Sequence, residues 1–260
     1  MVRRADLTDR PPPRSIDLAT PSVVLVVVAH PDDAEFQCGG TLSKWTRRGA
    51  AVHHLVLTDG SKGTWDRDAD QAELVERRRL EQVRASELLG GATVTFLGET
   101  DGELVADVTT RDRVCEVIRR LRPDVVLGHD PWKRYRLHPD HAAAGRLVVE
   151  GIVAARDPWF ARDQLADGLE PHRPRALMLF EPDAADHAES FGPEDLNRKV
   201  DALLAHRSQW ETTHLSRSSA AEDEAPLDAF RRREAELAGD AGRWAGTGLA
   251  EAFHLVDDEL

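Results

Sequence analysis

Val23-Val24-Leu25-Val26-Val27-Val28-Ala29 is the longest apolar run of this 260-residue chain, and His30-Pro31-Asp32-Asp33-Ala34-Glu35 follows it directly. A continuous run rich in β-branched residues, without polar alternation, is typical of a strand buried on both faces, as in a parallel sheet. Helical spacing follows over residues 34–48 and ends at Gly49. The sequence therefore predicts a buried strand, a turn rich in charged side chains, and a helix.

The same alternation of strand and helix continues along the chain. Further strands are predicted at residues 51–57, 93–97, 124–127 and 176–180, and helices at 71–89, 110–121, from about 139, at 194–210 and at 227–237. This order predicts an α/β fold with a doubly wound, mostly parallel, Rossmann-like sheet and helices on both faces. We expect residues 252–256 to return as a short edge strand.

The organisation predicted for the whole chain is simple. Residues 1–21 are charged and proline-rich and should form a flexible N-terminal arm. Residues 22–260 should form a single α/β domain, in which residues 211–226, rich in Ser, Thr, Ala and acidic residues, make a mobile loop.

Composition excludes several classes of function. Hydrophobic residues make up 41% and charged residues 31% of the chain, as in a soluble globular protein. The formal net charge of −13 argues against a nucleic-acid partner, which would call for a basic surface. No segment approaches the roughly 20 apolar residues of a membrane span, and residues 1–21 lack the apolar stretch of a signal peptide. We therefore expect a cytoplasmic protein.

The turn after the first strand carries the first chemical signal. In a doubly wound fold, ligands bind beyond the carboxyl ends of the strands. A dinucleotide-binding protein would place a glycine-rich turn there, whereas His30, Asp32, Asp33 and Glu35 would repel phosphate and attract a cation. The alternative is that the acids only stabilise the start of a helix, but this leaves His30 unexplained.

A second signal is His138-Pro139-Asp140-His141. Proline suits the first helical turn, so both imidazoles can share one helix face. The stretch from Gly128 to Trp132 leaves the carboxyl end of the preceding strand, which puts this motif on the same rim of the sheet as His30. His129 in this stretch could orient a ligand imidazole or be an ordinary loop residue. Mixed imidazole and carboxylate ligands suit zinc or a similar ion, and three ligands with an open position form a catalytic site.

Together, the two motifs resemble the PIG-L/LmbE family of zinc-dependent de-N-acetylases. Supporting matches are Thr58 to Thr64, Arg78-x-x-Glu81, Asp101-Gly102, Arg122 to Val126 and His206-x-Ser208-Gln209. The resemblance implies a metal-dependent hydrolase that removes the N-acetyl group of an N-acetylglucosamine-type amino-sugar conjugate through a zinc-activated water. Another divalent transition metal could replace Zn²⁺, and the partner would be this small molecule alone.

The resemblance also implies roles for seven residues. They are His30, Asp33 and His141 as metal ligands, Asp32 as general base, His138 at the carbonyl oxygen, and Arg78 and Asp101 at substrate hydroxyls.

Other functions stay open at this point. The same metal site could serve an amidase that cleaves a larger N-acyl or thiol-conjugate amide. The chain could also be a metal-stabilised binding protein without catalysis. A nucleotide-dependent transferase would rest on fold analogy alone, and the missing glycine-rich turn counts against it. Between about residue 150 and His206 no stretch matches the family, so the sequence does not identify the sugar.

Overall fold

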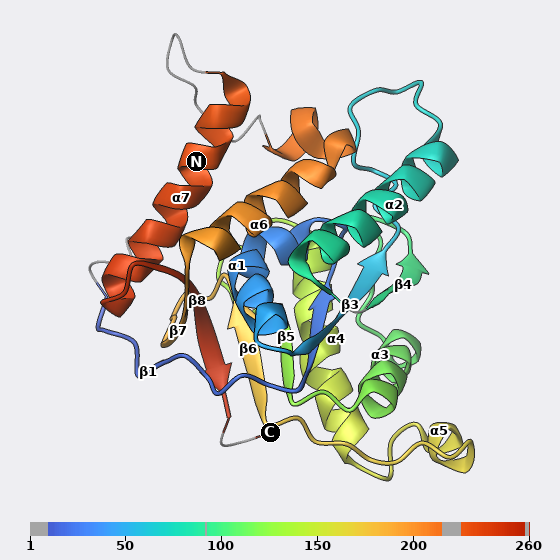
Figure 1. Cartoon of the computed structure of the whole chain (residues 1–260). Coiled ribbons are helices and arrows are strands. Elements are labelled where there is room, and N and C mark those ends of the chain that lie inside the picture. The colour runs from blue at the N-terminus through green and yellow to red at the C-terminus, as the bar shows by residue number, and fades with distance from the viewer. Residues whose placement is uncertain (1–9, 92, 215–224, 258–259) are drawn as a thin grey trace.

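The computed structural model describes residues 10–91, 93–214, 225–257 and 260. These residues include the eight strands of one sheet (Figure 1). The strands are β1 (Ser15–Ile16), β2 (Val23–Val28), β3 (Ala51–Thr58), β4 (Thr93–Glu99), β5 (Val125–His129), β6 (Ala176–Phe180), β7 (His187–Phe191) and β8 (Leu249–Val256).

The order of the strands is β1-β7-β8-β6-β5-β2-β3-β4. Neighbouring strands are parallel except that β8 runs antiparallel to both β6 and β7. From β2 the chain builds outward to β3 and β4 and then returns to β5 on the other side, so the winding reverses between β2 and β5. Such a reversal opens a crevice at the carboxyl ends of the two central strands. The predicted fold class is confirmed.

Helices cover both faces of this sheet (Figure 1). The longer ones are α1 (Asp33–Arg47), α2 (Gln71–Leu89), α3 (Val108–Leu121), α4 (Pro139–Arg156), α6 (Pro193–Ala205) and α7 (Pro226–Ala245). Along β2, Val24, Val26 and Val28 pack with α1, α2 and α6, whereas Leu25 and Val27 pack with α3 and α4. Burial on both faces is why this strand reads as an unbroken apolar run.

Helix α1 is interrupted in the middle. Cys38 has φ −146° and ψ 16°, outside the helical range. The interruption frees backbone N–H groups of the next turn, and Glu251 on β8 accepts hydrogen bonds from the backbone N–H groups of Gly40 and Thr41 at 3.0 and 2.9 Å. Lys199 on α6 pairs with the same carboxylate at 2.8 Å. A strand from the far end of the chain thus stabilises the helix that follows the first motif.

The prediction that residues 252–256 form an edge strand is wrong. Strand β8 lies inside the sheet between β6 and β7. An edge position was expected because the sequence does not predict β7, in which His187 and Glu189 are polar. Both side chains are fully buried, and they are paired, His187 with Ser15 at 2.8 Å and Glu189 with Lys44.

The N-terminal arm predicted for residues 1–21 is not loose throughout. Ser15 and Ile16 form β1, which pairs in parallel with β7. Lys44 on α1 also donates to Asp17 at 2.8 Å, which fixes the chain after this strand. Residues 1–9 of the predicted arm lie outside the described residues.

The second half of the chain differs from the prediction in its helix boundaries. Helix α6 ends at Ala205 rather than near residue 210, and it is followed by the 3₁₀-helix η2 (Arg207–Gln209) and the π-helix η3 (Trp210–His214). Of the loop predicted at 211–226, residues 215–224 lie outside the described residues. Helix α5 (Arg162–Ala166) was not predicted. Among the described helices, not one combines the length and the apolar character needed to cross a bilayer.

Candidate active site

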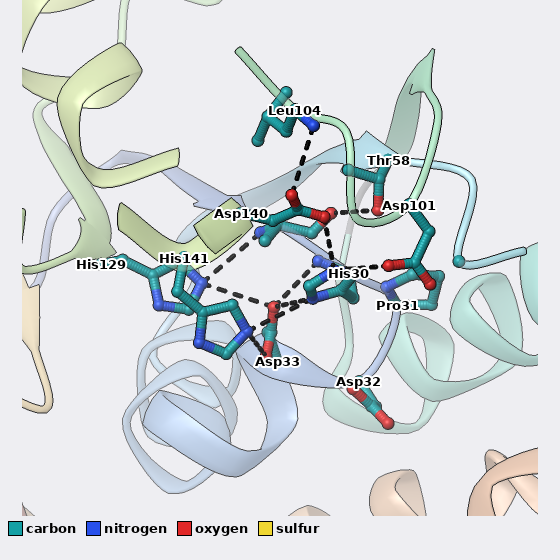
Figure 2. A network of polar contacts seen from close by, with 12 residues as sticks. His30, Pro31, Asp32, Asp33, Thr58, Asp101, Leu104, His129, Asp140 and His141 are labelled. Carbon is teal, nitrogen blue, oxygen red and sulfur yellow. Dashed lines mark hydrogen bonds and ion pairs between the residues drawn. The ribbon is translucent and has the colours of Figure 1, made fainter. Parts of the chain in front are cut away.

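The carboxyl ends of the central strands bring the predicted site residues together. His30 follows β2, His129 ends β5, Asp101 follows β4, and His141 lies in the first turn of α4. Figure 2 shows His30, Asp33, Asp101, His129, Asp140 and His141 gathered around one point. The crevice at the β2–β5 reversal therefore holds both sequence motifs.

His30, Asp33 and His141 have the spacing of metal ligands. The distances are 3.3 Å from His30 Nδ1 to His141 Nε2, 3.4 Å from His30 Nδ1 to Asp33 Oδ2, and 3.4 Å from His141 Nε2 to Asp33 Oδ1. Two atoms that bind zinc at about 2.1 Å in tetrahedral geometry lie about 3.4 Å apart. The donor set and its spacing thus fit a divalent ion. Among the described residues, three overlapping groups have ligand atoms close enough to hold a metal ion: His30 with His138 and His141, His30 with Asp101, His138 and Asp140, and Asp33 with His129 and His141.

The other ring nitrogen of His30 is held by carboxylates. Its Nε2 lies 3.1 Å from Asp101 Oδ1 and 3.1 Å from Asp140 Oδ2. Asp140 is fully buried and also accepts the backbone N–H groups of Gly102 and Leu104 at 2.6 and 3.2 Å. A carboxylate on the far nitrogen fixes the tautomer and orientation of a metal-binding imidazole and increases its basicity. Nδ1 of His30 is thereby directed at Asp33 and His141.

His129 lies beside this cluster. Its Nε2 is 3.4 Å from Asp33 Oδ2, and its ring stacks on that of His141 with centroids 4.2 Å apart. Burial lowers the pKa of His129 to about 4, although Asp33 opposes this effect. A neutral, fully buried imidazole at this position keeps Asp33 and His141 in place.

His138 stands at the open side of the cluster. It is the residue before α4, it is exposed, and its ring lies 4.5 Å from that of His30 and 5.0 Å from that of His141. Partial burial and the neighbouring imidazoles lower its pKa. At neutral pH the ring is therefore mostly uncharged and can donate a single hydrogen bond to an incoming oxygen.

In Figure 2 the side chain of Asp32 lies apart from the imidazoles of the metal-ligand cluster. Its Oδ2 is 3.6 Å from His214 Nε2 and 3.9 Å from Arg78 Nη2. Burial disfavours the charged carboxylate, but the hydrogen bond from His214 and the charge of Arg78 outweigh it, so the pKa of Asp32 is lowered. Its backbone has φ 91°, a left-handed conformation that is uncommon outside glycine.

The two residues predicted to hold substrate hydroxyls both line the crevice. Arg78 is 3% exposed and donates to two backbone carbonyls, Gly60 O at 2.9 Å and Pro31 O at 2.8 Å. Asp101 lies against His30 and accepts the backbone N–H of Lys62 at 3.1 Å. Both side chains thus hold parts of the protein as well as bordering the space for a ligand.

The crevice is a pocket of about 290 Å³ with a largely polar lining. Its walls come from residues that follow five different strands and from the 3₁₀- and π-helical segment after α6. The lining residues are His30, Asp33, Phe36, Gln37, Lys62, Gly63, Arg78, Asp101, Gly102, His138, His141, Glu181, Gln209 and Thr213.

Three residues that contact the predicted site residues had no role in the sequence interpretation. Asp140 stands inside the second motif, so the motif itself signalled it. Gln82 lies one helical turn after Arg78 on the buried face of α2, a position that periodicity could have drawn attention to. His214 ends the π-helix, and no pattern in Trp210–His214 identifies it.

Comparisons with known proteins identify the family of this chain. Residues 25–152 match the family model described as PIG-L, GlcNAc-PI de-N-acetylase. The chain is 37% identical over 187 residues to a diacetylchitobiose deacetylase of Thermococcus kodakarensis, covering 72% of this chain and 70% of the relative. It is also 27% identical over 237 residues to a 4-oxalmesaconate hydratase of Pseudomonas putida, covering 89% and 85%.

A solved structure shares the fold over most of the chain. The N,N'-diacetylchitobiose deacetylase of Pyrococcus horikoshii superposes with a TM-score of 0.80 at 27% identity, covering 91% of this chain and 84% of that protein. The similarity therefore extends well beyond the two motifs.

Proposed function

The chain belongs to the PIG-L family of de-N-acetylases, and from this premise we propose that it hydrolyses the N-acetyl amide of N-acetylglucosamine-type amino-sugar conjugates at a bound divalent metal ion, Zn²⁺ first among the candidates. The observation that carries the proposal is that His30, Asp33 and His141 bring nitrogen and oxygen atoms into pairwise distances of 3.3–3.4 Å at the wall of a polar pocket, with a different carboxylate oxygen of Asp33 facing each imidazole.

These three side chains would hold the metal. When bound, such an ion polarises a carbonyl oxygen and makes water acidic near neutral pH. A mixture of imidazole and carboxylate ligands favours zinc over magnesium or calcium, which prefer oxygen ligands alone. Asp101 and Asp140 would keep His30 in the tautomer that presents Nδ1 to the ion.

Two further residues would move protons and stabilise charge. Asp32 would accept a proton from the attacking water, since its lowered pKa keeps it ionised. His138 would donate a hydrogen bond to the carbonyl oxygen as negative charge develops there. The proton on Asp32 would then pass to the amide nitrogen as the carbon–nitrogen bond breaks, which releases acetate and leaves the amine on the sugar.

The lining of the pocket supports a neutral sugar as ligand. Its two basic side chains are already engaged: Lys62 donates to Glu103 at 2.8 Å and Arg78 donates to backbone carbonyls. A site for a substrate with several carboxylates would be expected to offer uncommitted cations. For this reason we favour deacetylation over the hydration named for the Pseudomonas putida relative.

The test is release of acetate from N,N'-diacetylchitobiose and from simple N-acetylglucosaminides by zinc-loaded protein. We expect turnover that chelation abolishes and Zn²⁺ restores. Asp32→Asn should lower kcat by about 100-fold or more, the scale of a lost general base, while the zinc content measured by elemental analysis stays at the wild-type value.

Two results would overturn parts of this proposal. Full activity of Asp32→Asn would remove Asp32 as the base. Faster release of longer acids than of acetate from matched N-acyl glucosaminides would favour the larger-acyl amidase instead.

A further inference from the structure

The backbone conformation of Asp32 depends on how the peptide group before it is held. This peptide joins Pro31 to Asp32, and both of its polar atoms are held by α2. Arg78 Nη2 donates to its carbonyl oxygen at 2.8 Å, and Gln82 Oε1 accepts its N–H at 2.9 Å. In a trans peptide the C=O and N–H point in opposite directions, so the two side chains grip the group from both sides.

Helical spacing makes this grip possible. Arg78 and Gln82 are four residues apart and therefore share one face of α2. Both are buried, at 3% and 0% exposure, and the face lies against the turn that carries the first motif. Fixing the plane of the peptide restricts the torsion on either side of it, one of which is the φ of Asp32, 91°.

A second contact sets which atom of the Gln82 amide faces Asp32. Gln82 Nε2 donates to Glu35 Oε1 at 2.8 Å, and Glu35 is fully buried. Because Glu35 presents an acceptor and the backbone of Asp32 presents a donor, one amide orientation satisfies both partners. Glu35 thus makes Gln82 an acceptor toward Asp32.

We propose that Gln82, oriented by Glu35, is a positioning residue that holds the Pro31–Asp32 peptide so that the Asp32 carboxylate is aimed for proton transfer. The inference rests on the proposed function, since it concerns the base of that reaction. Gln82 touches no substrate and acts through the backbone of Asp32. Release of the peptide would let Asp32 leave the left-handed conformation and move its carboxylate.

The first test is Gln82→Met, which keeps the length of the side chain but removes both hydrogen bonds. We expect kcat to fall about 10- to 100-fold, as for other losses of alignment, with KM changed less than about threefold and zinc content unchanged. The matched control is Ser86→Ala, one turn further along α2, which removes a buried contact with His54 Nδ1 at 3.2 Å. The control should keep wild-type kcat.

A swap of the two partners supplies a stricter test. Gln82→Glu alone places two carboxylates against each other and should lower kcat at least as much as Gln82→Met. Glu35→Gln combined with Gln82→Glu restores a donor–acceptor pair and should bring kcat back to within about threefold of wild type. Recovery of this kind is not expected of a residue that only fills space. Failure of the double variant to recover, in folded zinc-loaded protein, would overturn the proposal.

A crystal structure of Gln82→Met separates this inference from the function. We expect φ of Asp32 to leave the left-handed region and its carboxylate to shift, whatever the substrate turns out to be. An unchanged Asp32 in that structure would disprove the positioning role. If wild-type protein releases no acetate while the shift of Asp32 is observed, the proposed function fails and the role of Gln82 in holding the turn stands.

Discussion

Asp32 and Asp33 are neighbours in the chain, yet their carboxylates meet different partners. Burial disfavours the charged form of Asp33, but the imidazoles of His141, His129 and His30 outweigh it, so the pKa of Asp33 lies well below the usual range. Asp32 instead meets His214 and Arg78. The two residues also differ in backbone conformation, since Asp32 is left-handed and lies just outside α1, whereas Asp33 is the first residue of the helix.

The left-handed conformation should be measurable as a cost in stability. Asp32→Gly and Asp32→Ala both remove the carboxylate and its partners, so they differ in backbone preference. Because φ is 91°, we expect the glycine variant to be more stable to urea by about 1 kcal/mol. Equal midpoints for the two variants would show that Asp32 carries no backbone strain. Both variants should lack deacetylase activity.

The ligand assignment makes a separate prediction. His141→Gln removes one of the three side chains proposed to bind the metal. The affinity for zinc, measured by competition with a chromophoric chelator, should fall by about 100-fold or more. His53→Gln is a suitable control, because His53 lies on β3 and contacts Thr93 rather than the cluster. Unchanged affinity in His141→Gln would remove His141 from the ligands.

At the scale of elements, α1 depends on a residue far away in sequence. Glu251 accepts two backbone N–H groups after the break at Cys38 and also pairs with Lys199. Glu251→Ala would leave these N–H groups without their acceptor and would remove the closer of the two carboxylates of buried Lys199, whose other carboxylate partner is Glu234 at 3.9 Å. We expect a loss of about 3–5 kcal/mol in the free energy of unfolding. Glu150→Ala, at an exposed position on α4, should change it by less than about 0.5 kcal/mol.

How far the sequence predicts an element depends on where its polar groups find partners. Strand β2 was predictable because both of its faces are apolar. Helix α2 was predictable because Asp70 caps its first turn and Gly90 caps its last turn. Strand β7 was not, because the partners of its buried His187 and Glu189 come from distant segments. The same reason hid Gln82 and His214: their partner, Asp32, becomes a neighbour only after folding.

At the scale of the whole molecule, buried and partly buried carboxylates make stability depend on pH. Burial raises the pKa of Asp17 and of Asp124, but hydrogen bonds outweigh it, from Lys44 and Ser190 to Asp17 and from the N–H groups of Val23 and Ser22 to Asp124. Both folded pKa values are therefore lowered. A lowered pKa contributes stability above the unfolded value of about 3.9, and this contribution is lost as pH falls through the folded value.

The urea midpoint of chelated protein should fall in two stages. It should decrease gradually below about pH 6.5, where unfolded histidine gains a proton that buried His129, with a pKa of about 4, does not, and it should fall steeply below about pH 4 as the carboxylates are protonated. Asp124→Asn should be less stable than wild type at pH 7, and the difference should shrink as the pH falls, because protonation removes the advantage of the wild-type carboxylate. A difference that stays constant with pH would show that Asp124 is not linked to acid unfolding. Chelation keeps metal release from contributing.

Strand β8 also constrains the order in which the sheet can be completed during synthesis. Among the described strands, β7 and β1 reach the rest of the sheet through β8, although β1 is made first and β8 last. A ribosome that adds about 5–20 residues per second takes on the order of ten seconds or more to translate from β1 to β8. From the synthesis of β6 until that of β8, β6 presents an unpaired edge, and the nascent chain is exposed to pairing with other strands.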